Sequence, residues 1–259
     1  MWILPNPWYM THNKYLLIIF FVFKISFSQT IINTESLLRE IDSSFVFKIN
    51  TEADFNFGNI DLIQLNTALS LGKRFKNNLL RISFGHEYIS EEKETISNDW
   101  TGQMRLNHFF NDNSIFFFVQ GQNVVSLKLN HRYLIGAGCR NRIIKKSYNY
   151  IDLSAGGFFE NELYNENLID RVLINNFRYS FSSFSNIQIS EKVNLNTSIY
   201  YQLNSKNLKD YRLFFEPRLY FELKKISFYL DLKYRFHSTP YVNILNNDTE
   251  FLFGVEIDL

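Results

Sequence analysis

The chain of 259 residues predicts an all-β fold, a transmembrane antiparallel up-and-down β-barrel of about twelve strands. Near the carboxyl terminus every second side chain is apolar, at Phe251, Phe253, Val255, Ile257 and Leu259. This period of two is typical of a strand with one face in lipid and the other in water. Aromatic residues make up 17% of the chain although its mean hydropathy is slightly negative, so apolar and polar residues must be interspersed.

The amino-terminal segment has the features of a secretory signal. Lys14 is followed by an apolar run over residues 15–23, and small residues at Ser26 and Ser28 favour cleavage after Ser28. The run is shorter than the roughly 20 residues that a spanning helix needs. We therefore expect a signal peptide at 1–28, with a possible start at Met10, a short periplasmic segment at 29–44 and a barrel at 45–259. An uncleaved membrane anchor is the alternative.

The same alternation recurs at regular spacing along the chain, for example over residues 63–71, 80–88, 193–203 and 226–236. Each predicted strand is close to the roughly 9 to 11 residues that cross a bilayer at a tilt. With the amino terminus in the periplasm, odd-numbered links should be long and even-numbered links should be tight turns. The sequence predicts long links at 90–98, 161–167, 204–210 and 238–249, and tight turns at 111–113 and 224–225. The eighth link, 182–192, is an exception to this rule.

Aromatic residues near the predicted strand ends are suitable for the girdles that line the two membrane interfaces. For any one of them, ordinary packing along a strand remains an equal alternative. They include Tyr88, Trp100, Tyr150, Tyr164, Phe184 and Tyr241.

The polar face of the predicted strands carries positive and negative charge in similar amounts. Such charges are costly in lipid but tolerable in a wet interior, so we expect them to pair across strands and to fill the lumen. A soluble sandwich or lipocalin-like barrel also alternates and is the competing interpretation. The predicted lumen cluster, with a structural or selectivity role, comprises Arg105, Arg132, Arg140, Glu160, Glu162, Arg178, Arg212, Glu216, Arg218, Asp231 and Arg235.

The middle third of the chain resembles a known family. The segments that carry the resemblance are Gln120-Gly121-Gln122, residues 132–140 with Gly136 and Gly138, and residues 156–162. They are similar to the YdiY-like salt-induced outer-membrane proteins, domain-of-unknown-function family 481, in the form common among Bacteroidota. The resemblance extends over roughly residues 45–259 and implies an outer-membrane barrel. It brings no substrate and no catalytic residues.

Catalytic and metal-binding patterns are weak. A net charge of +1 gives no electrostatic case for nucleic acid, and the single Cys139 supports neither a disulfide nor a paired-thiol metal site. His86, His108 and His131 fall on the outward face without a suitable serine and orienting group. Asp231 and His237 are six residues apart, about 20 Å along a strand, which excludes their direct pairing. We expect no cofactor, no metal and no enzyme activity.

Glu160 and Glu162 are candidates for a paired carboxylate site. With Arg132 and Arg140 expected on the neighbouring strand, a structural salt-bridge cluster is the favoured interpretation.

The sequence is compatible with three functions. The favoured one is a structural or stress-related envelope protein with a charge-filled lumen. A small-solute channel is the first alternative, and an outer-membrane hydrolase is the second. In each case the expected location is the outer membrane of a Gram-negative bacterium, and the expected partners are outer-membrane lipid and the barrel-assembly machinery.

Overall fold

The computed structural model describes residues 45–56, 62–146, 149–165 and 171–258. The predicted signal peptide (1–28) and periplasmic segment (29–44) lie outside the described residues. Besides twelve strands, the described chain contains one short 3-10 helix, η3 (Val125–Leu127). The strands are β1 Phe45–Asn56, β2 Leu62–Phe75, β3 Asn78–Glu91, β4 Glu94–Phe110, β5 Asn113–Val124, β6 Leu129–Lys146, β7 Asn149–Asn165, β8 Arg171–Ser190, β9 Val193–Asn204, β10 Tyr211–Leu223, β11 Ile226–His237 and β12 Asn247–Asp258.

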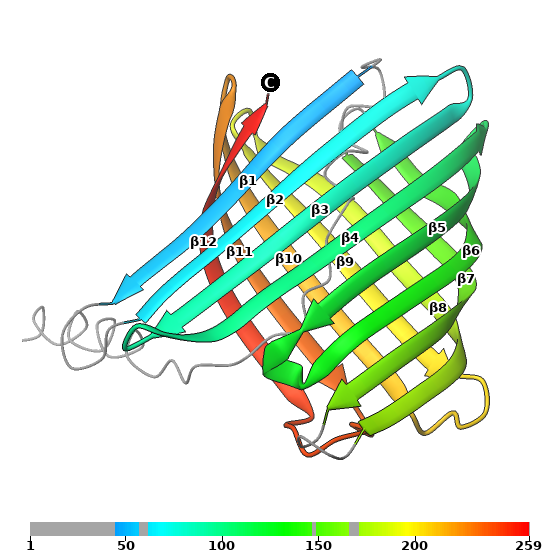
Figure 1. Cartoon of the computed structure of the whole chain (residues 1–259). Coiled ribbons are helices and arrows are strands. Elements are labelled where there is room, and N and C mark those ends of the chain that lie inside the picture. Colours follow the sequence, from blue (N-terminus) through cyan, green and yellow to red (C-terminus); the bar gives the residue numbers. More distant parts are fainter. Residues whose placement is uncertain (1–44, 57–61, 147–148, 166–170, 259) are drawn as a thin grey trace, which may run out of the picture.

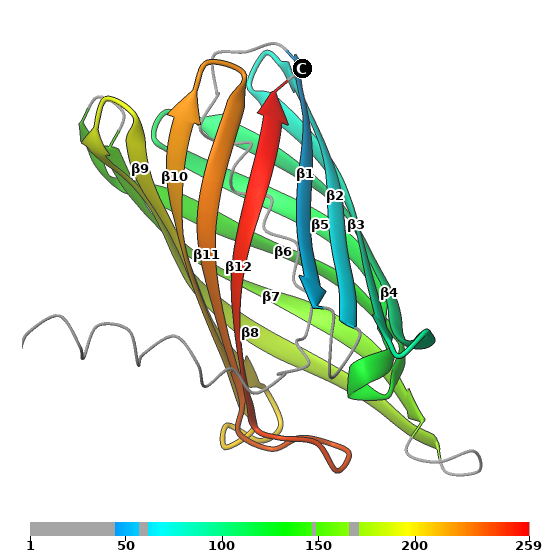
Figure 2. The same ribbon diagram turned by 90° about the vertical axis from the view of Figure 1, so that its left-hand side faces the viewer.

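The strands form one closed antiparallel barrel. Each strand pairs with the next along the chain, and β1 closes the ring by pairing with β12 from Lys48 opposite Asp258 to Glu52 opposite Gly254 (Figures 1 and 2). This seam pairs five residues of each strand, and it joins the first and last strands so that the sheet forms a ring. The predicted fold class and strand number are confirmed.

The two ends of the barrel differ. We call the end that holds the start of β1, the end of β12 and the links at 76–77, 111–112, 191–192 and 224–225 the turn end. The opposite end, here called the loop end, holds the links at 92–93, 125–128, 205–210 and 238–246. The long links predicted near 204–210 and 238–249 and the tight turns predicted near 111–113 and 224–225 are confirmed.

The third link is shorter than predicted. Strand β3 runs to Glu91 and β4 begins at Glu94, so only Glu92 and Lys93 connect them. Both have positive φ, at 49° and 69°, as a two-residue hairpin turn of type I′ requires. The expectation of a long link over 90–98 was wrong because Glu-Lys lacks the Asn-Gly or Asp-Gly pattern that normally marks such a turn.

The exceptional eighth link is also a tight turn. Strand β8 continues to Ser190, so only Glu191 and Lys192 connect it to β9. At 20 residues β8 is the longest of the described strands, and the shortest have 12. The predicted length of roughly 9 to 11 residues was therefore too short. The alternation of apolar and polar residues continues beyond the length that crosses the bilayer. The period of two therefore does not show where a strand leaves the membrane. The seventh link begins after Asn165 rather than at Asn161, because β7 extends that far.

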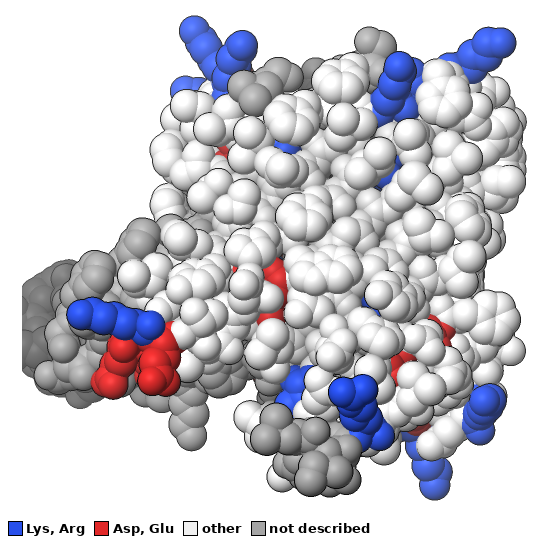
Figure 3. Space-filling view, viewed as in Figure 1, with Lys and Arg blue, Asp and Glu red and all other residues white. Residues whose placement is uncertain are grey.

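The outer and inner faces have opposite chemistry. Large apolar side chains such as Phe159, Ile135 and Phe253 are 63%, 49% and 58% exposed on the outside. Charged side chains such as Arg81 and Arg178 are wholly buried inside. Figure 3 shows a broad outer band with few charges and Lys, Arg, Asp and Glu gathered toward its two edges. An apolar belt of this kind around a polar interior is the arrangement of a membrane-spanning barrel, and it rules out a central oil-like core.

Several predicted girdle residues instead lie inside the barrel. Tyr150, Tyr164 and Phe184 are buried on the inner face, and Tyr241 reaches inward from the β11–β12 link. Trp100 is exposed on the outer face and fits the prediction. The girdle prediction used only closeness to a strand end. The face of a side chain depends on the parity of the residue within its strand, and parity places these three side chains in the lumen.

Candidate functional site

The eleven residues of the predicted lumen cluster all lie on the inner face of the barrel. Ten of them are buried, and Arg218 is half-buried with 12% of its side chain exposed. The structure does not join them into one cluster. It divides them into a network at the loop end, a second set along β10–β12, and two arginines nearer the turn end.

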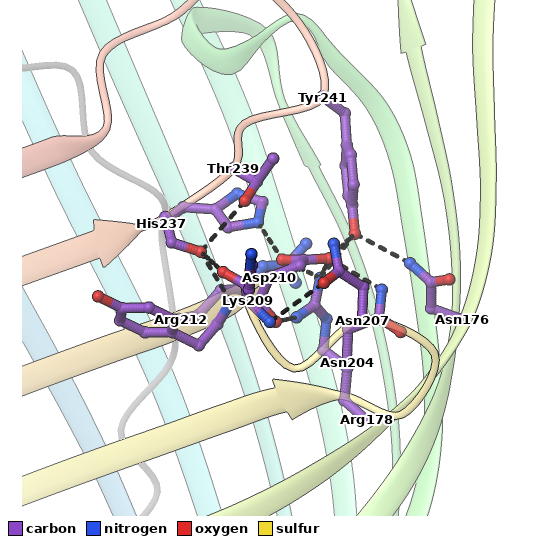
Figure 4. A network of polar contacts seen from close by, with 12 residues as sticks. Asn176, Arg178, Asn204, Asn207, Lys209, Asp210, Arg212, His237, Thr239 and Tyr241 are labelled. Atoms are coloured by element: carbon purple, nitrogen blue, oxygen red, sulfur yellow. Dashed lines mark hydrogen bonds and ion pairs between the residues drawn. The ribbon is translucent and has the colours of Figure 1, made fainter.

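The network at the loop end, here called the mouth network, comprises Arg132, Glu160, Glu162, Tyr164, Arg178, Asp210, Arg212, His237 and Tyr241. Figure 4 shows its loop side, where Arg178, His237 and Tyr241 surround Asp210. The three arginines of the network face three carboxylates, so the charge balances. Arg212 bridges both glutamates, at 2.9 Å from Glu160 and 3.1 Å from Glu162. Arg132 also pairs with Glu162. The salt-bridge interpretation of Glu160 and Glu162 is supported by these contacts.

Arg178 connects the glutamates to the loops. Its Nε donates to Glu160 at 2.6 Å, and its Nη2 donates to Asp210 at 2.9 Å and to the hydroxyl of Tyr241 at 2.6 Å. Its side chain has no exposed surface. A buried guanidinium is tolerated only when carboxylates and further hydrogen bonds compensate for its lost hydration, and Arg178 has both.

Asp210 is the central acceptor of the loop side and is absent from the predicted cluster. It lies in the β9–β10 link and accepts hydrogen bonds from Asn204, His237 and Tyr241 at 2.9, 2.9 and 2.7 Å. Burial alone would raise the pKa of Asp210, but these three hydrogen bonds and the charge of Arg178 together hold its pKa well below its usual range. Asp210 is therefore a carboxylate at neutral pH.

The turn that carries Asp210 is built by asparagines. Asn204 Oδ1 accepts from the backbone N–H of Lys206 at 3.0 Å, and Asn207 Oδ1 accepts from the backbone N–H of Lys209 at 3.2 Å. Asparagine commonly forms such local side-chain turns. An aspartate that follows an Asn-rich link was the available signal. Apart from Asn204, its partners His237, Tyr241 and Arg178 lie 27 to 32 residues away in the chain and leave no trace in a local pattern.

The β11–β12 link crosses the barrel opening. Val242 in this link packs into a buried apolar cluster with Val124, Leu127, Leu129 and Tyr164. Three of these belong to β5, η3 and β6, which lie five or six strands away from β11 and β12 around the ring. The link therefore spans from one wall to the opposite wall. Burial raises the pKa of Tyr241 above its ordinary value despite the charges of Arg178 and Arg212, so its hydroxyl stays protonated and can donate to Asp210.

The second set of charges follows β10, β11 and β12. Arg218 pairs with Asp231 at 2.5 Å, and Arg235 lies 3.5 Å from Glu216 and 3.6 Å from Glu250. Lys48 of β1 continues the series by pairing with Glu256 of β12 at 3.1 Å. These contacts tie β10 to β11, β11 to β12 and, through Lys48, β12 to β1.

Arg140 does not join Glu160 and Glu162. It lies nearer the turn end, where it pairs with Asp152 at 2.8 Å and its guanidinium stands 4.3 Å from the ring centre of Phe184. Arg140 and Arg132 point to the same face, but they are eight residues apart on β6, about 26 Å along a strand. The expectation that both would meet the same glutamates was therefore wrong for Arg140. Arg105, from the same predicted cluster, lies 4.0 Å above the ring of Phe116.

Glycines make room for aromatic rings inside the barrel. A Cβ atom at Gly136 would lie 2.5 Å from Cβ of Phe158, and one at Gly138 would lie 2.5 Å from Cζ of Phe116. Both distances are too short for non-bonded carbon atoms. The Gly-x-Gly pattern on β6 therefore makes room for packing, as expected for glycines within strands. The rings of Phe116 and Phe158 border an interior cavity of about 90 Å³.

The outward histidines bind asparagines. His86, His108 and His131 lie 2.7, 2.9 and 3.2 Å from the amide oxygens of Asn98, Asn78 and Asn161. His237, which cannot reach Asp231, instead pairs with Asp210. Within the described ranges no three His, Cys, Asp or Glu side chains are grouped so that they could hold a metal ion, and Cys139 is exposed on the outer face.

The closed ring, its apolar outer belt and its ionic interior define a membrane-spanning β-barrel protein. No helix in the described part of the chain is long and apolar enough to cross a membrane. The family model described as "Protein of unknown function, DUF481" matches residues 53–258, so the chain belongs to this family. The resemblance seen in the middle third of the sequence is thereby confirmed. No curated protein matches the chain.

Solved structures of similar shape are distant in sequence. A KdgM porin in complex with disordered oligogalacturonate is 12% identical, with a TM-score of 0.47, over 82% of this chain and 99% of that one. A NanC porin is 11% identical, with a TM-score of 0.48, over 83% and 100%. The translocator domain of the autotransporter NalP from Neisseria meningitidis is 8% identical, with a TM-score of 0.47, over 86% and 92%. Likeness at this level carries no functional argument.

Proposed function

We propose that this protein is a structural component of the outer membrane of a Gram-negative bacterium, with its barrel closed by its own side chains and loops. The observation that carries the proposal is the β11–β12 link, which crosses the opening and anchors Val242 on the opposite wall. The mouth network lies beside this link and joins it to β8 and β10 through Arg178, Asp210 and Tyr241. A freely diffusing solute would have to displace both.

Charge balance favours a permanently closed mouth. Separating Arg178 or Arg212 from its carboxylates would leave uncompensated charge in a poorly hydrated interior, which costs about 3–5 kcal/mol for a buried pair. Open pores present charges to a water-filled channel instead. In this barrel the charged groups satisfy one another, so they contribute to stability and closure.

The orientation follows from the two ends. Tight turns mark the periplasmic end of bacterial outer-membrane barrels and longer links mark the outside. We assign the loop end to the cell exterior. Outer-membrane lipid surrounds the apolar belt, and the barrel-assembly machinery inserts the protein. A Leu245→Cys variant in a Cys139→Ala background would react with a membrane-impermeant maleimide on intact cells, because Leu245 is exposed in the β11–β12 link. Labelling only after cell lysis would reverse the assignment.

Planar-bilayer recording tests closure. We expect the wild-type protein to show no large steady conductance and Val242→Asp to raise conductance, because a buried charge would expel the link from its apolar cluster. Leu245→Asp is the matched control, since the same charge at an exposed position of the same link should leave the barrel closed. A large steady current through the wild-type protein would overturn the proposal.

The small-solute channel is the second candidate, and the cavity inside the barrel favours it. A space of about 90 Å³ remains between the walls from β4 to β10, lined by polar and aromatic side chains. A channel would require this space to connect to both ends when the link moves. Conductance by the wild-type protein would select this candidate.

A stress-related role is part of the favoured proposal and is supported by the family resemblance. Growth of a deletion strain at raised salt concentration tests it. Unaltered growth and unaltered envelope permeability would remove the stress-related part while leaving the closed barrel in place.

A further inference from the structure

The cavity inside the barrel has an uneven charge. Among the residues that line it, three are arginines, namely Arg105, Arg132 and Arg212, and none is an aspartate or a glutamate. Glu160 and Glu162 pair with Arg132 and Arg212 but are not part of the lining. These glutamates neutralise Arg132 and Arg212, so what the wall offers a ligand is guanidinium hydrogen-bond donors, with no carboxylate in the lining to accept from them.

Hydrogen-bond donors in the lining lack acceptors. Gln103 Nε2 donates to Gln120 Oε1 at 2.8 Å, and Gln120 Nε2 donates to Gln122 Oε1 at 2.6 Å. This chain of amides ends at Gln122, whose buried Nε2 finds no acceptor in the described part of the protein. The Nε of Arg212 is likewise unsatisfied. Buried donors without acceptors are costly and uncommon in native structures, so the lining is suited to a ligand rich in acceptor oxygens.

The rest of the lining is aromatic. Phe116, Phe118, Phe158, Phe184 and Phe214 border the same space. Aromatic side chains around a cavity suit a flat apolar ring, while the arginines and glutamines suit a charged group at its edge. One water molecule needs at least about 10–15 Å³ of cavity volume. Since a water has one non-hydrogen atom, the cavity of about 90 Å³ has room for roughly six to nine non-hydrogen atoms.

We propose that this cavity is a binding site for a small organic carboxylate that carries a flat ring. The carboxylate lies against Gln122 and Arg212, with Arg105 adding positive charge from the side of Phe116. The ring lies among the phenylalanines. Binding needs no current through the barrel, so this site is independent of whether the mouth opens fully.

Calorimetric titration of the full chain in detergent micelles, with protein-free micelles subtracted, tests the site. Benzoate is the test ligand because it has nine non-hydrogen atoms, and benzamide is its neutral match. We expect saturable benzoate binding, and binding of benzamide at least about tenfold weaker because it lacks the charge-assisted hydrogen bonds. No saturation by millimolar benzoate would show that the cavity does not take such a ligand, and equal affinity for the two compounds would show that the carboxylate is not recognised; either result would overturn the proposal.

Variants locate the binding. Gln122→Met keeps the side-chain volume and removes the unpaired donor, and we expect it to weaken benzoate binding by about tenfold. Gln188→Met is the matched control, because Gln188 lies on β8 outside the cavity lining. Arg105→Met should reduce the ratio of benzoate affinity to benzamide affinity. This variant provides a second test if Gln122→Met does not fold. Benzoate binding that is unaltered in both cavity variants would place the ligand elsewhere and refute the proposal.

Discussion

Arg178→Met should be among the most destabilising single substitutions in the mouth network. It keeps most of the side-chain length and removes the guanidinium, which donates to Glu160, to both carboxylate oxygens of Asp210 and to Tyr241. Glu160 keeps Arg212 and Asp210 keeps His237, but both carboxylates remain buried with less compensation. Breaking a buried ion pair by removing one partner costs about 3–5 kcal/mol, and we expect a loss of that size in the free energy of unfolding.

Urea unfolding of the barrel refolded into lipid vesicles measures this loss. The matched control is Arg171→Met, an exposed arginine at the loop end of the same strand, which should change stability by less than about 0.5 kcal/mol. The double variant Arg178→Met with Asp210→Ala should be less destabilised than the sum of the single variants, because the two residues share one interaction. An Arg178→Met protein within about 1 kcal/mol of wild type would show that the mouth network does not contribute the stability assigned to it.

Three further outcomes follow from the described geometry. Gly138→Ala should lower the free energy of unfolding by about 1–3 kcal/mol through overpacking, because its methyl group would meet a phenyl carbon at 2.5 Å and a carbonyl oxygen at 2.6 Å. Gly102→Ala is the control in the same unfolding assay and should be nearly neutral, because the nearest neighbour of its methyl group would lie at 4.0 Å. Asp210 has a depressed pKa, so its contribution is complete above the unfolded value of about 3.9 and is lost only as pH falls through the lower folded-state pKa. The difference in unfolding free energy between wild type and Asp210→Asn should therefore stay constant from about pH 7 to 5 and shrink below about pH 4, and a steady decline between pH 7 and 5 would contradict the assignment. Ile135→Arg, on the outer belt, should lower the free energy of unfolding in vesicles by about 2–4 kcal/mol. Asn130→Arg, near the loop end of the same strand, should lower it by about 0–1 kcal/mol. Equal effects of the two substitutions would argue against a lipid-facing belt.

The alternation in the sequence was sufficient to predict the fold. A strand places successive side chains on opposite faces, so the period of two assigns Ile135 and Phe253 to the outside and Arg178 and Asp231 to the inside. The eleven predicted lumen residues lie on the predicted face for the same reason. The pairing of Arg132 with Glu162 was accessible as well, because both lie in adjacent strands of one hairpin.

Which inner charges meet was only partly accessible from the sequence. Arg140 was expected beside Glu160, but the register of β6 and β7 places it opposite Ser154, and its guanidinium pairs with Asp152. A local pattern identifies the face of a side chain but not its height in the barrel, because height depends on the lengths of the strands and on turns such as Glu92-Lys93 whose residues carry no standard signature.

The sequence by itself determined which side chains meet lipid and which meet the interior, since that choice depends only on the parity of each residue within its strand. Only the tertiary structure decided which interior charges pair and that the β11–β12 link crosses the mouth. Val242 acquires its partners from closure of the ring, which brings the opposite wall within reach of one link, whereas Asp210 and His237 meet because their strands end side by side. Those partners are set by the three-dimensional path of the chain, and no periodicity along it encodes them.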